Sequence, residues 1–462
     1  MSNHDLATII LAAGKGTRMK SDLVKVLHPL LGVPMVGYPI DLSLNGINSG
    51  KTIVVVGYQG EKIRAHFPDN RLIFVDQGDP LGTGHAVLCT ADHLKGFKGT
   101  VLILCADVPL LKRDTVKKCI DAHESNGSTI TVMTAILEDP AGYGRIVRMD
   151  GGLVGRIVEE GDASPPEMAI KEVNAGIYCI DSPFLFEALG QVRTDNAQGE
   201  YYLTDIAAIA NEQGKRVYGF AVEDPTEVMG INTRVDLAKA DEILRNELLT
   251  QMMLDGVTIV DPKTTYIDKT VRVGRDTVIY PNCYLQGETT IGERCVLEPN
   301  SQIIDSKISS DVVIRASSAI AESTINEGVS IGPFARLRPG TVVKRNARIG
   351  NFVEVKKSII GEGSKANHLT YLGDTTVGRD VNVGAGTITC NYDGEKKHPT
   401  VIEDEVFVGS NVELVAPVTV KKGSTIGAGS TITKDIPEGA LAISRSKQKT
   451  IRGWKQRKAR KK

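Results

Sequence analysis

The stretch VGRDTVIYPNCYLQGETTIGERCVLEPNSQI, residues 273–303, decides the fold of the second half of the chain. Aliphatic side chains recur in it at every sixth position, at Val273, Ile279, Leu285, Ile291, Leu297 and Ile303. Neither an α-helix nor a simple β-strand has this period, whereas a parallel β-helix places one hexapeptide on each of its flat sides. The pattern therefore predicts a prism of short strands around an aliphatic core.

The same six-residue spacing returns further along the chain, at Ile331, Leu337, Val343, Ile349 and Val355 and again at Val408, Leu414, Val420, Ile426 and Ile432. Glycine follows several of these aliphatics, at positions 274, 292, 332, 350, 409 and 427, and is expected to relieve tight corners. A β-sandwich would need two-residue alternation within longer strands, which is absent. The polar segment TCNYDGEKKHPT, residues 389–400, interrupts the hexads and is predicted to leave the prism as a loop.

The first half of the chain has a different texture. Short apolar runs lie at 6–11, 52–56, 72–75, 100–104 and 130–135, separated by stretches long enough for helices. This alternation predicts a Rossmann-like α/β domain, with a mostly parallel sheet covered on both faces. Residues 233–255 then predict one helix, started by Asn232 or Thr233 and ended by Gly256. Its apolar stripe is Leu237, Ala240, Leu244, Leu248 and Met252.

Composition excludes several classes of protein. The formal net charge of -1 leaves no global basic field for nucleic acid, and the basic run at 452–462 is interpreted as a solvated tail. Seven cysteines without a CxxC pair indicate free thiols in a reducing, cytoplasmic compartment. The first residues, MSNHDLATIILAAGKG, lack the charged start and long apolar core of a signal peptide, and no apolar stretch is long enough to span a bilayer.

The segment LAAGKGTRM, residues 11–19, directly follows the first predicted strand. Glycines at 14 and 16 let backbone amides approach a phosphate chain, and a helix start adds a favourable dipole. The segment is neither GxxxxGK[ST] nor GxGxxG, which disfavours a P-loop ATPase and a dinucleotide oxidoreductase. A tight turn without any ligand would look similar, so this loop alone does not establish a site.

A set of further motifs follows in order along the chain. They are Lys25 in SDLVKVLH, Gln77 to Thr83 in DQGDPLGTGHA, Asp107 in LCADVPLL, GYGR at 142–145, Glu159 in IVEE, Asn174 in VNAGI and Asn232 in GINTR. With LAAGKGTRM they resemble nucleotide-sugar pyrophosphorylases. The match is to the uridylyltransferase half of the bifunctional N-acetylglucosamine-1-phosphate uridylyltransferase / glucosamine-1-phosphate acetyltransferase family, and it covers essentially the whole chain.

This resemblance implies a nucleotidyl-transfer site that uses Mg²⁺, held by the oxygens of Asp107 and Asn232. Arg18 and Lys25 are implied as catalytic phosphate cations. The implied UTP-binding residues are Leu11, Ala12, Ala13, Gly14, Lys25, Gln77, Gly82 and Thr83, and the implied N-acetylglucosamine-binding residues are Gly144, Glu159, Asn174 and Asn232. Two positions depart from the family pattern, because Val24 stands where proline is usual and Gly161 where lysine is common.

The second half carries its own motifs: RLRPG at 336–340, NFVEVKK at 351–357, KANHLTYLGD at 365–374, VNVGAGTITCNYDG at 381–394 and AISR at 442–445. They resemble the acetyltransferase half of the same family. Acetyl transfer needs an unprotonated amine, and a histidine suits the role of base. The resemblance implies His368 as that base, with Glu354 as its possible partner; His398 is a rival base without matching context. The implied glucosamine-1-phosphate residues are Arg338, Lys356, Tyr371 and Asn382, and the implied acetyl-CoA residues are Ala385, Asn391, Tyr392, Ser410, Ala428 and Arg445.

These observations predict four segments: a nucleotidyltransferase domain at 1–230, a connecting helix at 231–256, a left-handed β-helix acetyltransferase domain at 257–445 and a basic tail at 446–462. The resemblance implies that the β-helix acetylates glucosamine-1-phosphate with acetyl-CoA. The first domain would then transfer UMP from UTP to the product, giving UDP-N-acetylglucosamine and pyrophosphate for cell-wall and lipopolysaccharide precursors. No nucleic-acid or membrane partner is expected.

The resemblance also implies a homotrimer, in which the loop 389–400 carries Asn391 and Tyr392 to another chain's His368. A surface excursion on a monomer is the alternative for this loop. Two other functions stay open: a single-activity sugar nucleotidyltransferase with a structural or regulatory β-helix, and a non-catalytic interaction protein. His368, Lys356 and the NYDG loop disfavour the former, and Asp107, Lys25 and Asn232 the latter.

Overall fold

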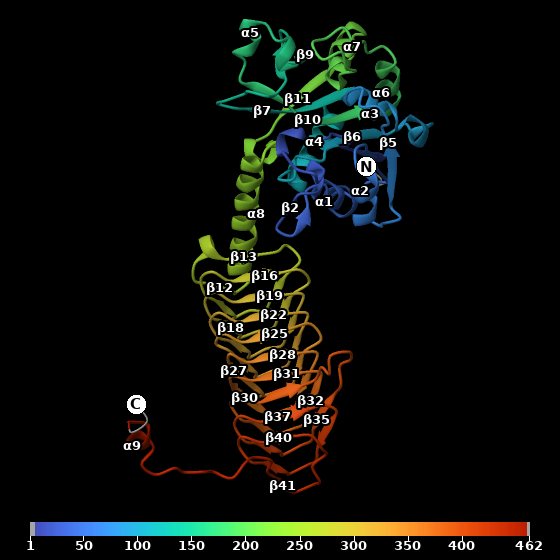
Figure 1. Ribbon diagram of the computed structural model, residues 1–462. Coiled ribbons are helices and arrows are strands. Elements are labelled where there is room, and N and C mark those ends of the chain that lie inside the picture. The colour runs from blue at the N-terminus through green and yellow to red at the C-terminus, as the bar shows by residue number, and fades with distance from the viewer. Residues whose placement is uncertain (1–4, 460–462) are drawn as a thin grey trace. The chain divides into compact units, whose positions relative to one another are not determined.

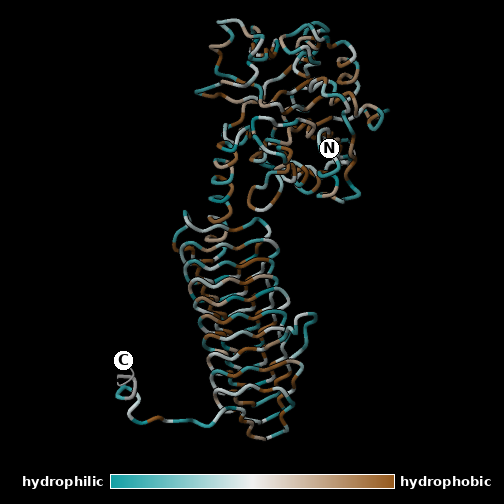
Figure 2. Tube along the Cα trace, viewed as in Figure 1, coloured by the Kyte–Doolittle hydropathy of each residue, from teal (hydrophilic) through white to brown (hydrophobic). Residues whose placement is uncertain are grey.

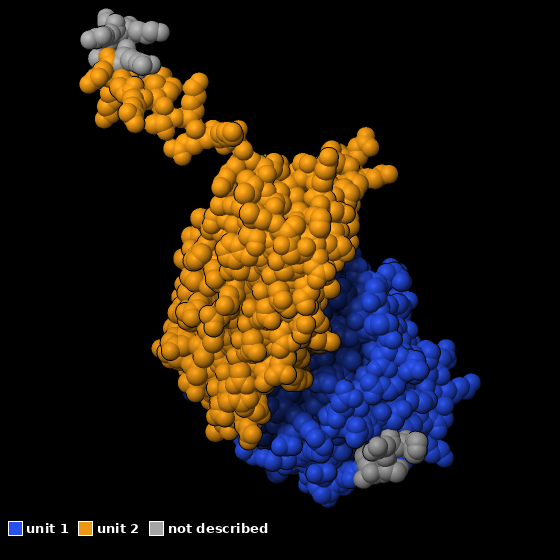
Figure 3. All heavy atoms as spheres, turned by 90° about the horizontal axis from the view of Figure 1, so that it is seen from below, with its two compact units in different colours: residues 1–244 blue, residues 245–462 orange. Residues whose placement is uncertain are grey.

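The computed structural model describes residues 5–459. It divides within helix α8 (Arg234–Leu254) into two compact units, Met1–Leu244 and Arg245–Lys462 (Figure 3). The predicted basic tail contains a short helix, α9 (Trp454–Ala459), and its last residues, 460–462, lie outside the described part. Across residues 5–459, no helix is both long and apolar enough to cross a membrane.

The first unit is built on one sheet with the strand order β11-β7-β10-β6-β1-β4-β5 (Figure 1). The strands are β1 (Leu6–Ala12), β4 (Lys51–Val56), β5 (Leu72–Asp76), β6 (Thr100–Cys105), β7 (Ile130–Ile136), β8 (Arg145–Arg148), β9 (Val154–Val158), β10 (Glu172–Asp181) and β11 (Val217–Ala221). The helices are α1 (Gly37–Asp41), α2 (Gly60–His66), α3 (Thr83–Leu88), α4 (Arg113–Ser125), α5 (Pro165–Met168), α6 (Ser182–Leu189) and α7 (Ile206–Glu212). A small hairpin, β2 (Pro29–Leu30) with β3 (Val33–Pro34), lies outside this sheet.

Both faces of this sheet are buried, as the apolar runs predict. Along β1, Ala7 and Ile9 join the core that contains residues of α3, α6 and α7. Ile10 and Ala12 join a second core, which contains residues of α2 and α4. Successive strand residues point to opposite faces, so a strand covered on both sides is apolar throughout.

One strand departs from the parallel arrangement. β10 runs antiparallel to both of its neighbours, β6 and β7, and the hairpin β8–β9 is joined to it at Val173. Burial on both faces makes the strands equally apolar whatever their direction, so the apolar runs do not reveal the reversal.

The second unit is a left-handed parallel β-helix made of three stacked sheets (Figure 1). The first sheet contains β12 (Thr258–Ile259), β15 (Val278–Ile279), β18 (Val296–Leu297), β21 (Val313–Ile314), β24 (Ser330–Ile331), β27 (Arg348–Asn351), β30 (Lys365–His368), β33 (Asn382–Val383), β36 (Phe407–Val408), β39 (Thr425–Ile426) and β41 (Leu441–Ala442). The second contains β13 (Tyr266–Ile267), β16 (Tyr284–Gln286), β19 (Gln302–Ile304), β22 (Ala319–Ala321), β25 (Arg336–Leu337), β28 (Glu354–Lys356), β31 (Tyr371–Gly373), β34 (Ile388–Cys390), β37 (Glu413–Val415) and β40 (Thr431–Ile432). The third contains β14 (Arg272–Val273), β17 (Thr290–Ile291), β20 (Lys307–Ile308), β23 (Thr324–Ile325), β26 (Val342–Val343), β29 (Ile359–Ile360), β32 (Thr375–Val377), β35 (Thr400–Ile402) and β38 (Val418–Val420).

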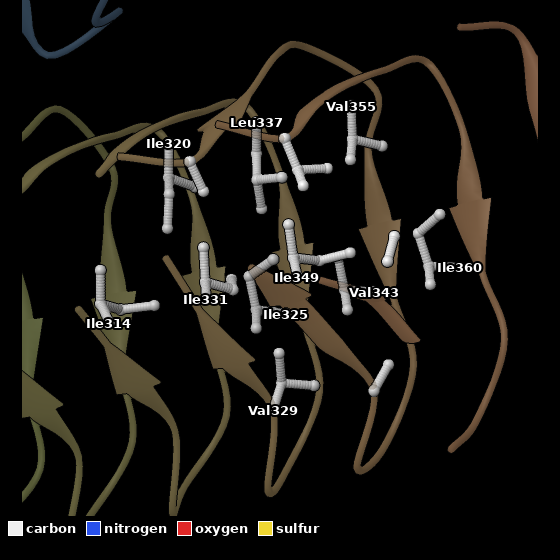
Figure 4. Close-up of a cluster of buried hydrophobic side chains, with 14 of the residues drawn as sticks. Ile314, Ile320, Ile325, Val329, Ile331, Leu337, Val343, Ile349, Val355 and Ile360 are labelled. Atoms are coloured by element: carbon white, nitrogen blue, oxygen red, sulfur yellow. The ribbon is translucent and has the colours of Figure 1, made fainter. Parts of the chain in front are cut away.

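Each coil of the prism stacks directly on the next. Paired strands lie 17 or 18 residues apart, as in Val278 with Val296 and Val296 with Val313. Most of the six-spaced aliphatics are fully buried in one continuous core, whose columns are visible in Figure 4. Figure 2 shows the same hydrophobic positions recurring along the coils. The hexapeptide prediction is confirmed.

The glycines act differently from the expectation. Of the six predicted corner glycines, only Gly332 has a positive φ. A Cβ on Gly350 would lie 1.8 Å from the carbonyl oxygen of Asn367 in the next coil, and one on Gly292 would lie 2.5 Å from the Ser310 nitrogen. These glycines therefore allow close stacking of coils, while left-handed corner positions are taken by residues such as Asn282.

Helix α8 begins after Thr233, whose hydroxyl accepts a hydrogen bond from the Asp236 amide (3.2 Å) and donates one to its carboxylate (2.8 Å). The first part of the helix contributes Ala240 to a core of the first unit. The last part contributes Leu249 and Met252 to the prism core. The reciprocal Thr233–Asp236 bonds also fix the chain beside Asn232, because the Asp236 carboxylate accepts the Asn232 amide (3.2 Å).

Candidate active sites

A cavity of about 380 Å³ lies at the carboxyl ends of β1, β5 and β6. Ligands bind at this edge in open α/β sheets. The structure brings together there all eight predicted nucleotide residues and one predicted metal ligand: Leu11, Ala12, Ala13, Gly14, Lys25, Gln77, Gly82, Thr83 and Asp107. Residues up to 96 positions apart in the sequence, Leu11 and Asp107, thus share one wall.

The glycine-rich loop fits closely against Lys25. Gly16 has φ 64°, and a Cβ at this position would lie 2.4 Å from the Lys25 Cβ. Only glycine combines this left-handed conformation with so close an approach. The loop therefore fixes one side of the Lys25 stem.

Two cations and two oxygens meet at the mouth of this cavity. Lys25 Nζ donates to Asp107 Oδ2 at 2.6 Å and to Asn232 Oδ1 at 3.1 Å. Arg18 also donates to Asn232 Oδ1, at 2.9 Å. Lys25 and Asp107 have side-chain exposures of 12% and 25%, so the pair is partly shielded from solvent and its charge attraction is strengthened. The four predicted charge-handling residues form one cluster.

This donor set fits a hard divalent cation. Carboxylate and amide oxygens of Asp107 and Asn232 converge on one ammonium group, which shows that a positive charge is accommodated between them. The described residues contain no group of three or more His, Cys, Asp or Glu side chains placed to bind a metal. Mg²⁺ typically takes only one or two protein oxygens and fills its other positions with phosphate and water oxygens.

The wall for the base is held by hydrogen bonds within the chain. Gln77 Nε2 donates to the Gly82 carbonyl (2.9 Å), and the Thr83 hydroxyl accepts from the Leu203 amide (3.1 Å). Sequence reasoning missed three further lining residues, Lys15, Cys105 and Glu200. Burial raises the pKa of the Cys105 thiol to about 12, so that group stays neutral.

The predicted sugar residues lie together beside this cavity. The Gly144 carbonyl accepts the Asn174 amide at 2.9 Å, and a Cβ on Gly144 would lie 3.5 Å from the Glu159 carboxylate. The Asn174 side chain accepts from the Gly176 amide (3.0 Å), and Gly176 in turn accepts from the Cys105 thiol (3.2 Å). Asn174 is thereby linked to the nucleotide cavity.

Glu159 is the one titratable group of the sugar cluster. Its Oε1 accepts from the Thr204 hydroxyl at 3.1 Å, and burial raises the pKa of the Glu159 carboxyl. Gly161, the position where lysine is common, lies exposed in the short 3-10 helix Glu160–Asp162.

On the prism, His368 begins a column of predicted acetyl-CoA residues. The strand register Ala366–Val383–Val408–Ile426 places the residues two positions further on above one another: His368, Ala385, Ser410 and Ala428. Arg445 donates to the Ala428 carbonyl at 2.6 Å and completes the column. Coils are about 4.8 Å apart, so the column from His368 to Ala428 spans roughly 14 Å and suits an elongated ligand.

The expected partner of His368 is corrected by this register. Asn351 pairs with His368 in the first sheet, and the Nδ1 of His368 lies 2.7 Å from Asn351 Oδ1. Glu354 lies in the second sheet opposite Tyr371 and accepts from Arg338 at 3.0 Å. Asn351 stands 17 residues before His368, one coil of the prism, so the coil period is the signal that could have found it.

The predicted glucosamine-1-phosphate residues divide between two sheets. Arg338 follows β25, while Lys356 and Tyr371 lie in β28 and β31 of the same second sheet. Asn382 lies in the first sheet, on β33. Lys356 forms an ion pair with Asp374 (3.6 Å), and the adjacent Lys356 ammonium lowers the pKa of Lys397. Closely spaced cations of this kind suit a phosphate.

The interrupting loop projects from the prism between β34 and β35, as predicted (Figure 1). Asn391 does not reach outward, which corrects the expected placement of its side chain. It is 7% exposed and donates to Asp374 of its own chain at 2.5 Å. Tyr392 is 59% exposed, and the rival base His398 is paired with Asp393 (2.6 Å).

Comparisons with known proteins agree with both halves. The family described as nucleotidyl transferase matches residues 7–226, and the family described as bacterial transferase hexapeptide (six repeats) matches residues 270–305 and 399–434. The cavity and the column thus belong to a two-part transferase, a nucleotidyltransferase followed by a hexapeptide-repeat domain.

Relatives extend the likeness to the full chain. The chain is 51% identical over 453 residues to the bifunctional protein GlmU of Pelobacter propionicus, covering 98% of each chain. It is 52% identical to the bifunctional protein GlmU of Geobacter sulfurreducens, covering 98% of this chain and 99% of the relative. The bifunctional protein GlmU of Shouchella clausii is 48% identical, with 95% of this chain and 96% of the relative covered. The chain belongs to the family of bifunctional GlmU proteins.

Proposed function

We propose that this chain makes UDP-N-acetylglucosamine in two steps, as a uridylyltransferase and an acetyltransferase. The prism acetylates glucosamine-1-phosphate with acetyl-CoA. The first unit then transfers UMP from UTP to N-acetylglucosamine-1-phosphate and releases pyrophosphate. The observation that carries this proposal is the presence of a phosphate-handling cluster in one unit and of a histidine-led column in the other.

In uridylyl transfer, an oxygen of the sugar-1-phosphate attacks the α-phosphorus of UTP, and the bond to pyrophosphate breaks. Such reactions depend on charge neutralisation and in-line positioning. Lys25 and Arg18 neutralise phosphate oxygens, while Gln77 and Gly82 bind the base beside the cavity wall. Glu159 and Asn174 hold the sugar.

Nucleotidyltransferases of this class use a divalent metal. We assign it as Mg²⁺, held by Asp107 and Asn232, since both supply hard oxygen ligands at the cavity. When bound, it neutralises charge on the phosphates.

In acetyl transfer, the amine of glucosamine-1-phosphate attacks the thioester carbonyl, an amide bond forms and the CoA thiolate leaves. His368 takes the amine proton at Nε2, because Asn351 accepts a hydrogen bond from Nδ1–H and holds that tautomer. The column of Ala385, Ser410, Ala428 and Arg445 binds acetyl-CoA, with Tyr392 as a further contact. Arg338, Lys356, Tyr371 and Asn382 bind the acceptor sugar.

We further propose that the chain acts as a homotrimer whose acetyltransferase site is shared between copies. The division of acceptor residues between two sheets and the outward-facing Tyr392 support this assembly. A cytoplasmic location is supported by seven cysteines that form no disulfide. The proposed functional segments are 1–230, 231–256 and 257–445, with 446–462 as a basic tail of no assigned role.

One assay with two variants tests the proposal. The full-length chain receives glucosamine-1-phosphate, acetyl-CoA, UTP and Mg²⁺, and both products are measured. Asp107→Ala should lower uridylyl transfer at least about a hundredfold and leave acetylation intact. His368→Ala should lower acetylation by roughly 10²–10⁴-fold and leave uridylyl transfer intact. A single-activity nucleotidyltransferase would yield no acetylated product from the wild-type chain.

A further inference from the structure

Val24 directly precedes Lys25 and has an unusual requirement for a partner. Its backbone, at φ -57° and ψ 140°, has the conformation that proline adopts, yet valine retains an N–H group. Val24 is 1% exposed, and a buried N–H without an acceptor is strongly unfavourable. An acceptor must therefore be supplied from elsewhere in the fold.

Gln59 supplies it. Its Oε1 accepts from the Val24 amide at 3.2 Å, while its Nε2 donates to the Asp22 carbonyl at 2.7 Å. These two bonds fix the orientation of the amide, because only oxygen accepts and only nitrogen donates. One side chain thus holds the backbone on both sides of Leu23.

Gln59 occupies a backbone conformation that is unfavourable for its residue type. Its φ is 57° and its ψ is 30°, in the left-handed region, at the start of α2. Glycine or asparagine would adopt this conformation more easily. A strained residue at this point indicates that its side chain has a role, which the two hydrogen bonds provide.

The held segment determines where Lys25 lies. Gly16 confines the Lys25 stem from the loop side, with a Cβ approach of 2.4 Å. Gln59 fixes the preceding backbone, so that the ammonium group reaches Asp107 and Asn232. We propose that Gln59 is a positioning residue for uridylyl transfer, giving Val24 the restraint that a proline would supply. This inference rests on the proposed uridylyltransferase function.

The test uses the full-length chain with UTP, N-acetylglucosamine-1-phosphate and Mg²⁺. Gln59→Gly removes both hydrogen bonds but relieves the left-handed strain, so the thermal midpoint should be unchanged or raised. The kcat/KM for UTP should nevertheless fall about tenfold, as expected for a lost hydrogen bond at a charged site. Acetyl transfer serves as an internal control, and Gln213→Ala, a glutamine after α7, serves as the matched variant.

Rescue distinguishes positioning from mere support of the fold. Val24→Pro removes the N–H that needs Gln59, so it should be near wild type alone and should restore most of the activity lost in Gln59→Gly. Gln59→Glu keeps the acceptor for Val24 but loses the donor to Asp22, so its loss should be smaller than that of Gln59→Gly. Unchanged kcat/KM in Gln59→Gly would overturn the inference, as would a loss that Val24→Pro fails to restore in a folded double variant or that Gln59→Glu equals. Absence of product from the wild-type chain would instead reject the proposed function.

Discussion

At the residue scale, Asn351 holds His368 in the orientation that a base requires. Asn351→Leu should lower acetyl transfer roughly tenfold, the equivalent of one lost hydrogen bond, and less than His368→Ala does. Initial rates with glucosamine-1-phosphate and acetyl-CoA measure the effect. Asn326→Leu, an asparagine after a strand of the third sheet, is the control. Equal rates for wild type and Asn351→Leu would remove the assigned role of Asn351.

The buried carboxyl of Glu159 predicts a pH dependence of stability. Burial raises its folded-state pKa, so the folded protein binds this proton more tightly than the unfolded chain does. Stability from this group therefore falls as pH rises from the unfolded pKa, about 4.3, through the folded one.

Glu159→Gln should accordingly have the higher thermal midpoint at pH 7–8, and the difference should vanish below about pH 4. Glutamine keeps an oxygen to accept from Thr204, so the comparison isolates the charge. The same variant should raise the KM for N-acetylglucosamine-1-phosphate, because the sugar loses a charged acceptor. Differential scanning fluorimetry across pH measures the first effect; a midpoint difference independent of pH would contradict this assignment.

At the scale of elements, the distance between coils sets which corner residues are tolerated. A Cβ on Gly350 would meet the Asn367 carbonyl at 1.8 Å, while one on Gly427, at the equivalent corner near the last coil, would meet only the Ile443 side chain at 3.1 Å. Gly350→Ala should therefore destabilise the prism by about 1–3 kcal/mol, as overpacking typically does. Gly427→Ala should have little effect.

Thermal or chemical unfolding of both variants, compared with acetyl transfer, checks this prediction. Gly350 lies beside Asn351, so acetylation should fall together with stability in Gly350→Ala. Equal stability of the two glycine variants would show that coils can separate more easily than the stacking indicates.

At the scale of the whole molecule, a shared acetyltransferase site can be tested by mixing chains. Asn391 is buried against its own chain, so Tyr392 is the appropriate loop residue. His368→Ala and Tyr392→Ala, each impaired alone, are unfolded and refolded together. If one site takes the two residues from different chains, some mixed sites contain both wild-type residues and activity returns in part. Refolding each variant by itself is the control; no gain on mixing, or a monomeric mass at assay concentration, contradicts the shared site.

Much of this protein follows from sequence alone. The six-residue period determines the prism, because each hexad must turn one inward aliphatic toward the core. The ordered motifs identify the residues that gather at the cavity, since the strand ends of an α/β sheet meet at one edge. The polar loop is also predictable, because TCNYDGEKKHPT has no aliphatic hexad to bury.

Only the tertiary structure decided the contacts between coils and between distant loops. The antiparallel direction of β10 is hidden because burial on both faces makes every strand equally apolar. The pairing of His368 with Asn351 rather than Glu354 depends on which sheet each residue enters, and that is set by register across coils of 17 or 18 residues. The hold of Gln59 on Val24 joins segments 35 positions apart through one side chain, and no local pattern encodes such a bond. Local periodicity fixes the elements, whereas hydrogen bonds between elements depend on distances that exist only after the chain has folded.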